Sequence, residues 1–155
     1  MADIFACGTR SAVMAAIKGR GNQQTEMRMI EILRSHCLTG WRRHQRLPGC
    51  PDFAFRHQRV VLFVDGCFWH GCPKHGRKPS SNQSYWLPKL ERTRMRDKAT
   101  NRKLRKLGWQ VVRFWAHSLG DDQKVAGRLR KVLNSANVTA TRRQLPARRR
   151  VGEAD

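Results

Sequence analysis

Residues of the types that bind metal ions crowd into one short segment, VDGCFWHGCPKHG, at positions 64–76. The segment follows directly on the apolar run RVVLFV. Within it, Cys67, Cys72 and His75 have the spacing C-x4-C-x2-H, and thiolate and imidazole ligands in a tetrahedral array suit zinc. A buried cysteine pair with unrelated histidines is the alternative interpretation. The segment therefore predicts a loop held by a metal ion at the end of a strand.

A tetrahedral site needs a fourth ligand beyond these three. The best candidate is His117, at the end of the predicted strand WQVVRFWAH, because the end of a strand can bring the backbone close to the loop. A zinc ion with four protein ligands has no open position for water, so it stabilises the fold and cannot catalyse. Any catalysis must then come from other side chains of this region.

Several acidic residues and one histidine are left over for chemistry. They are Asp52, Asp65, His70, Asp97 and Glu26. Two carboxylates near the ends of adjacent strands, with a third acid on a helix, are a usual way to hold magnesium for phosphodiester hydrolysis. Taken singly, Asp52 after a proline and Asp65 before a glycine are also ordinary turn residues. The inward-facing position predicted for Asp97 favours the hydrolase interpretation.

The charge of the chain points to a polyanionic partner. Among 155 residues, 32 lysines and arginines face 11 acids, which gives a net charge of +21. Phosphates of nucleic acid are the most economical partner for such an excess. A membrane surface is the rival, but the chain carries no lipidation motif and no apolar segment of spanning length. The odd count of cysteines, 5, and an N-terminus without a signal-peptide core predict a cytosolic protein with free or metal-bound cysteines.

Hydrophobic periodicity predicts one α/β domain over residues 1–134. We expect a basic N-terminal helix at about residues 9–20 and a second helix at 23–37, with Met27, Ile30, Leu33 and Cys37 on one face. A strand hairpin begins at Asp52, with RHQR at its tip. The remaining predicted elements are a helix from its cap at Ser84 to Gly108, a strand at 109–117, a helix at 123–133 and a disordered basic tail at 135–155.

Two aromatic residues, Phe68 and Trp69, lie inside the predicted metal loop, and Trp86 follows nearby. They could pack beneath the metal site, or they could insert into a base stack and kink a duplex. The residues by themselves favour neither interpretation.

Several motifs together resemble the very-short-patch (Vsr-type) DNA mismatch repair endonucleases. They are TRSAVMAAIKGRGNQQTE, LPGCPDF, VDGCFWHGCPKHG, YWLPKL, RD and LGWQVVRFW, and they extend over residues 9–133. The resemblance implies a restriction endonuclease-like fold of the PD-(D/E)XK type, a mixed sheet flanked by helices, with a structural zinc. It also implies an enzyme that nicks one strand 5′ to the thymine of a T:G mismatch, the lesion left by deamination of 5-methylcytosine.

The resemblance also assigns roles to residues. It makes Asp52 the main magnesium ligand, with the main-chain carbonyl of Val64, and makes His70 the general base with Asp97 as its partner. It makes Glu26 an acid from an N-terminal helix. Phe68, Trp69 and Trp86 match positions that intercalate beside the mismatch, and Cys67, Cys72, His75 and His117 match the zinc positions, one of which can be cysteine.

Asp65 departs from part of the family, because some members have histidine at this position. It either binds the metal directly or acts as an auxiliary acid or base. No lysine follows Asp65 in the D-x-K pattern of this superfold, and we expect His70 to take over that role.

The sequence thus predicts a magnesium-dependent DNA nicking endonuclease with a structural zinc. A homing-type nuclease of the same fold that cuts intact duplex is one alternative, and a non-catalytic zinc-stabilised DNA-binding protein is another. Acids close to phosphate repel it, which argues against the pure binder. We expect a monomer in the bacterial cytoplasm, associated with the nucleoid and not with a membrane. Its partner is double-stranded DNA with a T:G mismatch, and mismatch-repair proteins and a DNA polymerase act downstream.

Overall fold

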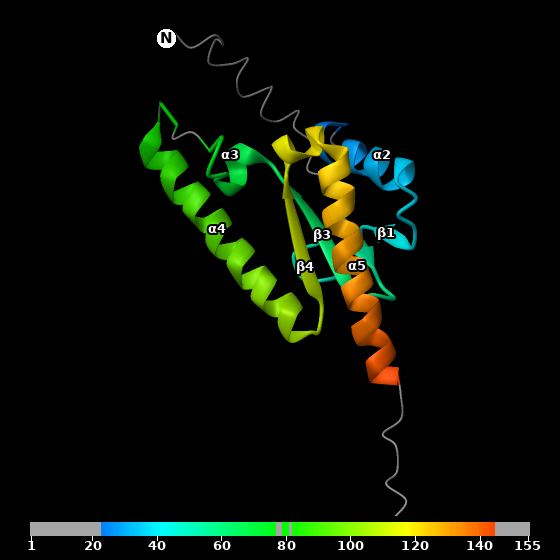
Figure 1. Ribbon diagram of the computed structural model, residues 1–155. Helices are drawn as coiled ribbons and strands as arrows, with labels where there is room; N and C mark the ends of the chain where they lie inside the picture. Colours follow the sequence, from blue (N-terminus) through cyan, green and yellow to red (C-terminus); the bar gives the residue numbers. More distant parts are fainter. Residues whose placement is uncertain (1–22, 77–78, 81, 145–155) are drawn as a thin grey trace, which may run out of the picture.

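The computed structural model describes residues 23–76, 79–80 and 82–144 (Figure 1). The helix predicted at residues 9–20 lies outside these ranges. In chain order the elements are η1 (Gln23–Met27, a π-helix), α2 (Arg28–Ser35), β1 (Trp41–Arg43), β2 (Phe53–Phe55), β3 (Val60–Asp65), α3 (Cys67–His70), α4 (Gln83–Lys106), β4 (Gln110–Trp115), η2 (Ala116–Gly120, a 3-10 helix) and α5 (Asp122–Gln144).

The strands form one mixed sheet of four strands in the order β1-β2-β3-β4. Strand β2 runs antiparallel to both of its neighbours, β1 and β3, and β4 runs parallel to β3. Parallel neighbours need a long crossover, which here contains α3 and α4. This arrangement confirms the predicted hairpin and a mixed α/β fold with helices packed on the sheet.

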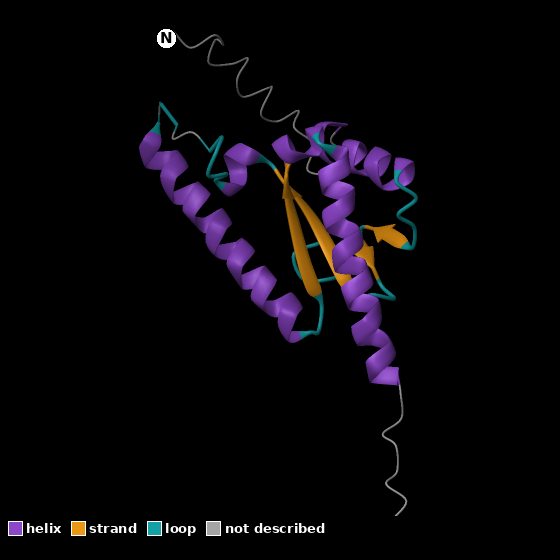
Figure 2. Cartoon of the chain, viewed as in Figure 1, coloured by secondary structure: helices purple, strands orange, loops and turns teal. Residues whose placement is uncertain are grey.

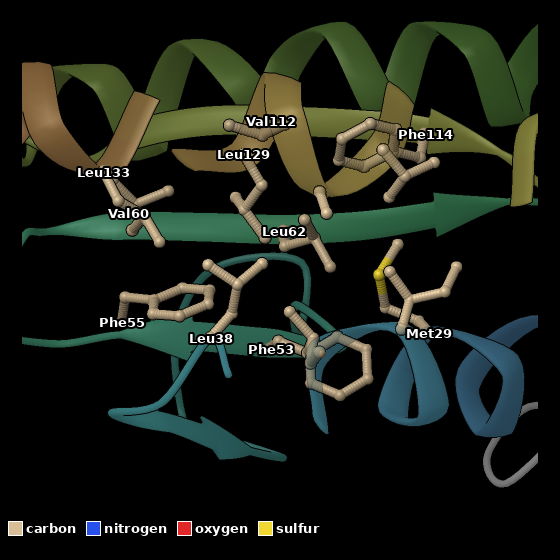
Figure 3. Close-up of a cluster of buried hydrophobic side chains, with 14 of the residues drawn as sticks. Met29, Leu38, Phe53, Phe55, Val60, Leu62, Val112, Phe114, Leu129 and Leu133 are labelled. Atoms are coloured by element: carbon tan, nitrogen blue, oxygen red, sulfur yellow. The ribbon is translucent and has the colours of Figure 1, made fainter. Parts of the chain in front are cut away.

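Helices cover both faces of the sheet. Figures 1 and 2 show α4 on one side of β3 and β4, and α5 on the other. Because side chains alternate along a strand, Val60 and Leu62 of β3 face α5 together with Val112 and Phe114 of β4. Figure 3 shows this larger core, which Met29 of α2 and Leu129 of α5 complete.

The face toward α4 has a much smaller apolar cluster. Its buried members are Ala54, Val61, Phe63 and Leu104. Continuing the same alternation, Asp65 follows Val61 and Phe63 onto this face at the end of β3. Polar groups therefore replace apolar ones at one end of the layer between the sheet and α4, and this end holds the candidate site.

Helix α4 differs in detail from the prediction. It begins at Gln83 after Asn82, and Asn82 makes no side-chain cap bond, so the predicted cap at Ser84 was wrong. Leu107, which follows the last residue of the helix, is exposed. The predicted stop at Gly108 is confirmed, since this residue has a φ of +78°, which glycine adopts without steric cost.

The second helix also differs on its buried face. Ile30 and Leu33 are buried as predicted, together with Met29 and Ile32, whereas Met27 and Cys37 are exposed. Met27 lies in the π-helical turn of η1, which departs from regular α-helical spacing, and Cys37 lies beyond the end of α2 at Ser35.

The last helix is longer than predicted. It continues to Gln144, and Ala136 within the extension is buried, so the predicted disordered tail does not begin at residue 135. Residues 145–155 lie outside the described ranges. Within the described ranges, every helix is too short or too polar to cross a membrane.

Candidate active site and metal centre

Three aspartates and a histidine meet where β3 ends. Asp52 precedes β2, Asp65 ends β3, His70 ends α3, and Asp97 lies midway along α4. All four line one cavity of about 480 Å³, together with Val64. The structure therefore brings together four of the five predicted catalytic residues.

Asp52 is fixed to the sheet by the neighbouring strand. Its Oδ2 accepts a hydrogen bond of 2.7 Å from the backbone N–H of Val64. Burial raises the pKa of Asp52 to about 6, and the nearby charges of Glu26 and Asp65 act in the same direction. A half-buried carboxylate of this kind, among other acids, is suited to binding a cation, which would stabilise its charged form.

Glu26, the fifth predicted residue, does not line this cavity. It is buried, and its carboxylate forms an ion pair with Arg43 of β1. Its charge still contributes to the raised pKa of Asp52. Glu26 thus lies near Asp52 but outside the cavity, and Arg43 balances its charge.

His70 is held by two carboxylates. Its Nδ1 lies 2.6 Å from Oδ2 of Asp97 and 3.6 Å from Oδ1 of Asp65. Since a carboxylate accepts, Nδ1 carries the proton that it donates to Asp97. The other ring nitrogen, Nε2, is then the proton acceptor of the neutral imidazole.

An arginine that the sequence analysis missed connects these acids. Arg113 of β4 donates to Asp65 from Nε at 2.7 Å and from Nη2 at 3.1 Å, and its Nη2 lies 3.3 Å from Oδ1 of Asp97. Its Nη1 donates to Asn101 at 3.0 Å, and its guanidinium stacks on Phe63 with 4.6 Å to the ring centroid. Arg113 therefore neutralises charge at the two acids that flank His70.

Strand register explains why this arginine reaches the site. Arg113 pairs with Phe63 across the parallel strands, and both side chains point toward α4. A signal was present in the sequence, because Arg113 interrupts the apolar run of a strand between Val112 and Phe114. An arginine in such a position needs a buried partner of opposite charge.

The four predicted zinc ligands also meet. The ligand atoms of Cys67, Cys72, His75 and His117 all lie within 4.8 Å of one another. Cys67 Sγ is 3.1 Å from Nδ1 of His117, and Cys72 Sγ is 3.6 Å from the same atom. Metal–ligand bonds of about 2.0–2.3 Å place tetrahedral ligands about 3.5 Å apart, so these residues fit a tetrahedral metal ion.

The protonation of two of the four ligands suits a metal as well, whereas burial raises the pKa of the Cys67 thiol. Desolvation and the charges of His75 and Lys74 lower the pKa of His117, which favours the neutral imidazole that binds metal. Although burial opposes it, hydrogen bonds from the backbone at His75 and Lys74 lower the pKa of Cys72 and favour its thiolate. One detail of the prediction was wrong: His117 lies in η2, after the strand, and not at its end.

The aromatic residues of the loop form a cluster with α4. Phe68 and Trp69 have ring centroids 5.2 Å apart, and Trp86 lies 5.7 Å from Phe68 and 5.8 Å from Trp69. Lys89 lies over Trp86 with 5.1 Å to the centroid, and the exposed Tyr85 packs on its edge. None of these rings belongs to the two buried clusters of the described residues.

Comparison with known proteins identifies relatives of this chain. A family model described as DNA mismatch endonuclease Vsr matches residues 2–75. The DNA mismatch endonuclease Vsr of Escherichia coli strain K12 is 34% identical over 126 residues, which cover 81% of this chain and 80% of that protein.

Two nicking enzymes are also similar. The type II nicking enzyme V.XorIIP of Xanthomonas oryzae pv. oryzae is 43% identical over 97 residues, 61% of this chain and 71% of that protein. The type II nicking enzyme V.NaeI of Lentzea aerocolonigenes is 51% identical over 67 residues, and this match spans 43% of the chain and 40% of V.NaeI.

Proposed function

The chain belongs to the DNA mismatch endonuclease Vsr family, and we propose that it is a magnesium-dependent endonuclease that nicks duplex DNA 5′ to the thymine of a T:G mismatch. The observation that carries this proposal is the cavity in which Asp52, Asp65, His70 and Asp97 meet. The net charge of +21 supports a nucleic-acid substrate. The placement of Asp52 before β2 and Asp65 at the end of β3 supports a restriction endonuclease-like core.

Asp52 and the main-chain carbonyl of Val64 are the proposed magnesium ligands. The raised pKa of Asp52 supports a cation at this place. Burial and the neighbouring acids disfavour the ionised carboxylate, and a bound cation would stabilise it. When bound, magnesium supplies positive charge for the scissile phosphate and for the attacking oxygen.

His70 is the proposed general base. Asp97 holds Nδ1–H at 2.6 Å, so Nε2 accepts a proton from water in the cavity, and the two flanking carboxylates stabilise the imidazolium that forms. Asp65 has an auxiliary role in this scheme as the second carboxylate beside His70, and Arg113 donates to both of its oxygens. That contact argues against direct metal binding by Asp65.

We assign zinc to the Cys67, Cys72, His75 and His117 cluster. Four protein ligands leave no open position, so this metal is structural. It would hold the region of α3 and η2 together, which keeps Phe68 and Trp69 in place as the proposed wedge beside the mismatch.

Duplexes that differ at one position test the function. Each carries T:G, T:A or C:G at its centre, each strand is labelled separately, and Asp52→Asn serves as the inactive control. Nicking of the thymine strand in the T:G duplex alone, dependent on magnesium, is the expected result. Equal cleavage of all three duplexes would favour the homing-type nuclease, and tight binding with no cleavage would favour the non-catalytic protein.

A further inference from the structure

The second half of α4 carries a dense set of unpaired cations. Between Lys98 and Lys106 the chain has five basic residues and no acid. These basic residues are Lys98, Arg102, Lys103, Arg105 and Lys106, and all are exposed. Within the described ranges, none of them forms an ion pair with a carboxylate.

Part of this basic surface is hollowed. A groove of about 430 Å³ runs between the turn at Pro48 and Gly49 and the helix, with Lys103 and Lys106 along its wall. The turn approaches α4 closely, since a Cβ at Gly49 would lie 2.2 Å from Cγ2 of Thr100. We call this feature the basic groove.

The basic groove joins the catalytic cavity. Gly49, Arg96 and Thr100 line both hollows. A polyanionic strand whose phosphate lies in the cavity can therefore reach the neighbouring groove past these shared residues.

Three functional regions follow one another along α4. Trp86 of the aromatic cluster stands near its start, Asp97 in the middle and Lys106 at its end. At 1.5 Å per residue, Trp86 is about 16 Å from Asp97 along the helix, and Lys106 is about 14 Å beyond it in the other direction. The aromatic cluster and the basic groove thus lie on opposite sides of the catalytic cavity.

We infer that the basic groove binds the phosphate backbone of the duplex arm 5′ to the nick. This inference rests on the proposed function, in which the aromatic cluster meets the mismatch on the 3′ side of the scissile bond. A length of about 14 Å corresponds to about four base pairs, since each strand carries one phosphate per 3.4 Å of helix axis. The groove therefore recognises backbone charge and not base sequence.

Duplexes with one shortened arm test the inference. Each carries a T:G mismatch, and the arm 5′ or 3′ to the nick is cut to two base pairs. Binding is measured without magnesium at several salt concentrations, for wild type, for Lys103→Gln/Lys106→Gln, and for the control Lys124→Gln/Lys131→Gln on α5. Both control lysines are exposed and belong to α5, which lies across the sheet from α4.

Shortening the 5′ arm should weaken binding about tenfold for wild type and the control, and much less for Lys103→Gln/Lys106→Gln. On the full duplex, this variant should lower the slope of log affinity against log salt by about two, because each substituted lysine leaves one phosphate without its neutralising charge. If each shortened arm weakens the binding of this variant and of the control by the same factor, the inference is overturned.

Methylphosphonate linkages test the same idea without changing the protein. Placed at the four phosphates 5′ to the nick, they should weaken wild-type binding and leave the affinity of Lys103→Gln/Lys106→Gln nearly unchanged. Equal weakening of both proteins would overturn the inference. Because these are binding measurements, they separate the groove from the proposed reaction. If the protein nicks T:G duplex but its affinity does not depend on the 5′ arm, the proposed function stands and the inference about the basic groove fails.

Discussion

Replacing Arg113 by methionine removes the guanidinium that Asp65 and Asp97 share. The side chains of Arg113 and Asp97 are 20% exposed and that of Asp65 is 7% exposed, so the acids cannot regain full hydration. Removing one partner of a buried ion pair costs about 3–5 kcal/mol. Because His70 still donates to Asp97, we expect a loss near the lower end, about 3 kcal/mol in the free energy of unfolding.

The measurement is urea unfolding at pH 7 with zinc present. Methionine keeps apolar contact with Phe63, so the loss reports mainly on charge. Arg128→Met is a matched control, since Arg128 stacks on Phe114 at 4.8 Å but is exposed and bonds no carboxylate among the described residues. We expect the control to change stability by about 0.5 kcal/mol or less.

A double variant identifies the cause of the loss. Adding Asp65→Asn to Arg113→Met removes one of the two stranded charges, so we expect it to regain about 1–2 kcal/mol. The reasoning fails if Arg113→Met is no less stable than Arg128→Met, or if the double variant is less stable than Arg113→Met alone.

Three further predictions concern the other parts of the site. Because the folded pKa of Asp52 is raised to about 6 from 3.8, this carboxyl stabilises the fold only while protonated, and its contribution is lost as pH rises through 6. The free energy of unfolding of Asp52→Asn relative to wild type should therefore rise by about 2 kcal/mol between pH 4 and pH 7, measured by urea unfolding without magnesium. A difference between the two proteins that does not change with pH would contradict the raised pKa. Removal of metal from the Cys67, Cys72, His75 and His117 cluster by a chelator should unfold the protein, as followed by circular dichroism with metal analysis, and a folded metal-free protein would refute the structural role. Trp69→Ala should reduce the preference for T:G over T:A duplex at least tenfold, about 1.4 kcal/mol, in parallel titrations, and an equal loss for both duplexes would make Trp69 a packing residue.

Much of the site was predictable because strand alternation is simple. Asp65 directly continues β3, and the position of Asp97 on α4 follows from helical spacing. Both side chains therefore had to face the layer between sheet and helix. His70 needed only three residues of helix after Cys67 to reach the same layer.

The remaining features depend on contacts between segments far apart in the chain. Arg113 lies 48 residues from Asp65, and only the parallel register of β3 and β4 brings them together. Strand β1 has three residues, too few for a visible alternation, and it forms by pairing with β2. The π-helical turn at η1 likewise leaves no periodic signal of its own, so the exposure of Met27 within it was not predicted.

The shortness of α3 limits how this region could be re-engineered. Its four residues begin with a proposed metal ligand and end with the proposed base, and the two aromatic rings stand between them. A single inserted residue would rotate His70 by about 100° relative to Cys67 and turn it away from Asp97. Attempts to change the substrate by lengthening this segment would therefore disable the enzyme, and useful variation is confined to exchanging the side chains at positions 68 and 69.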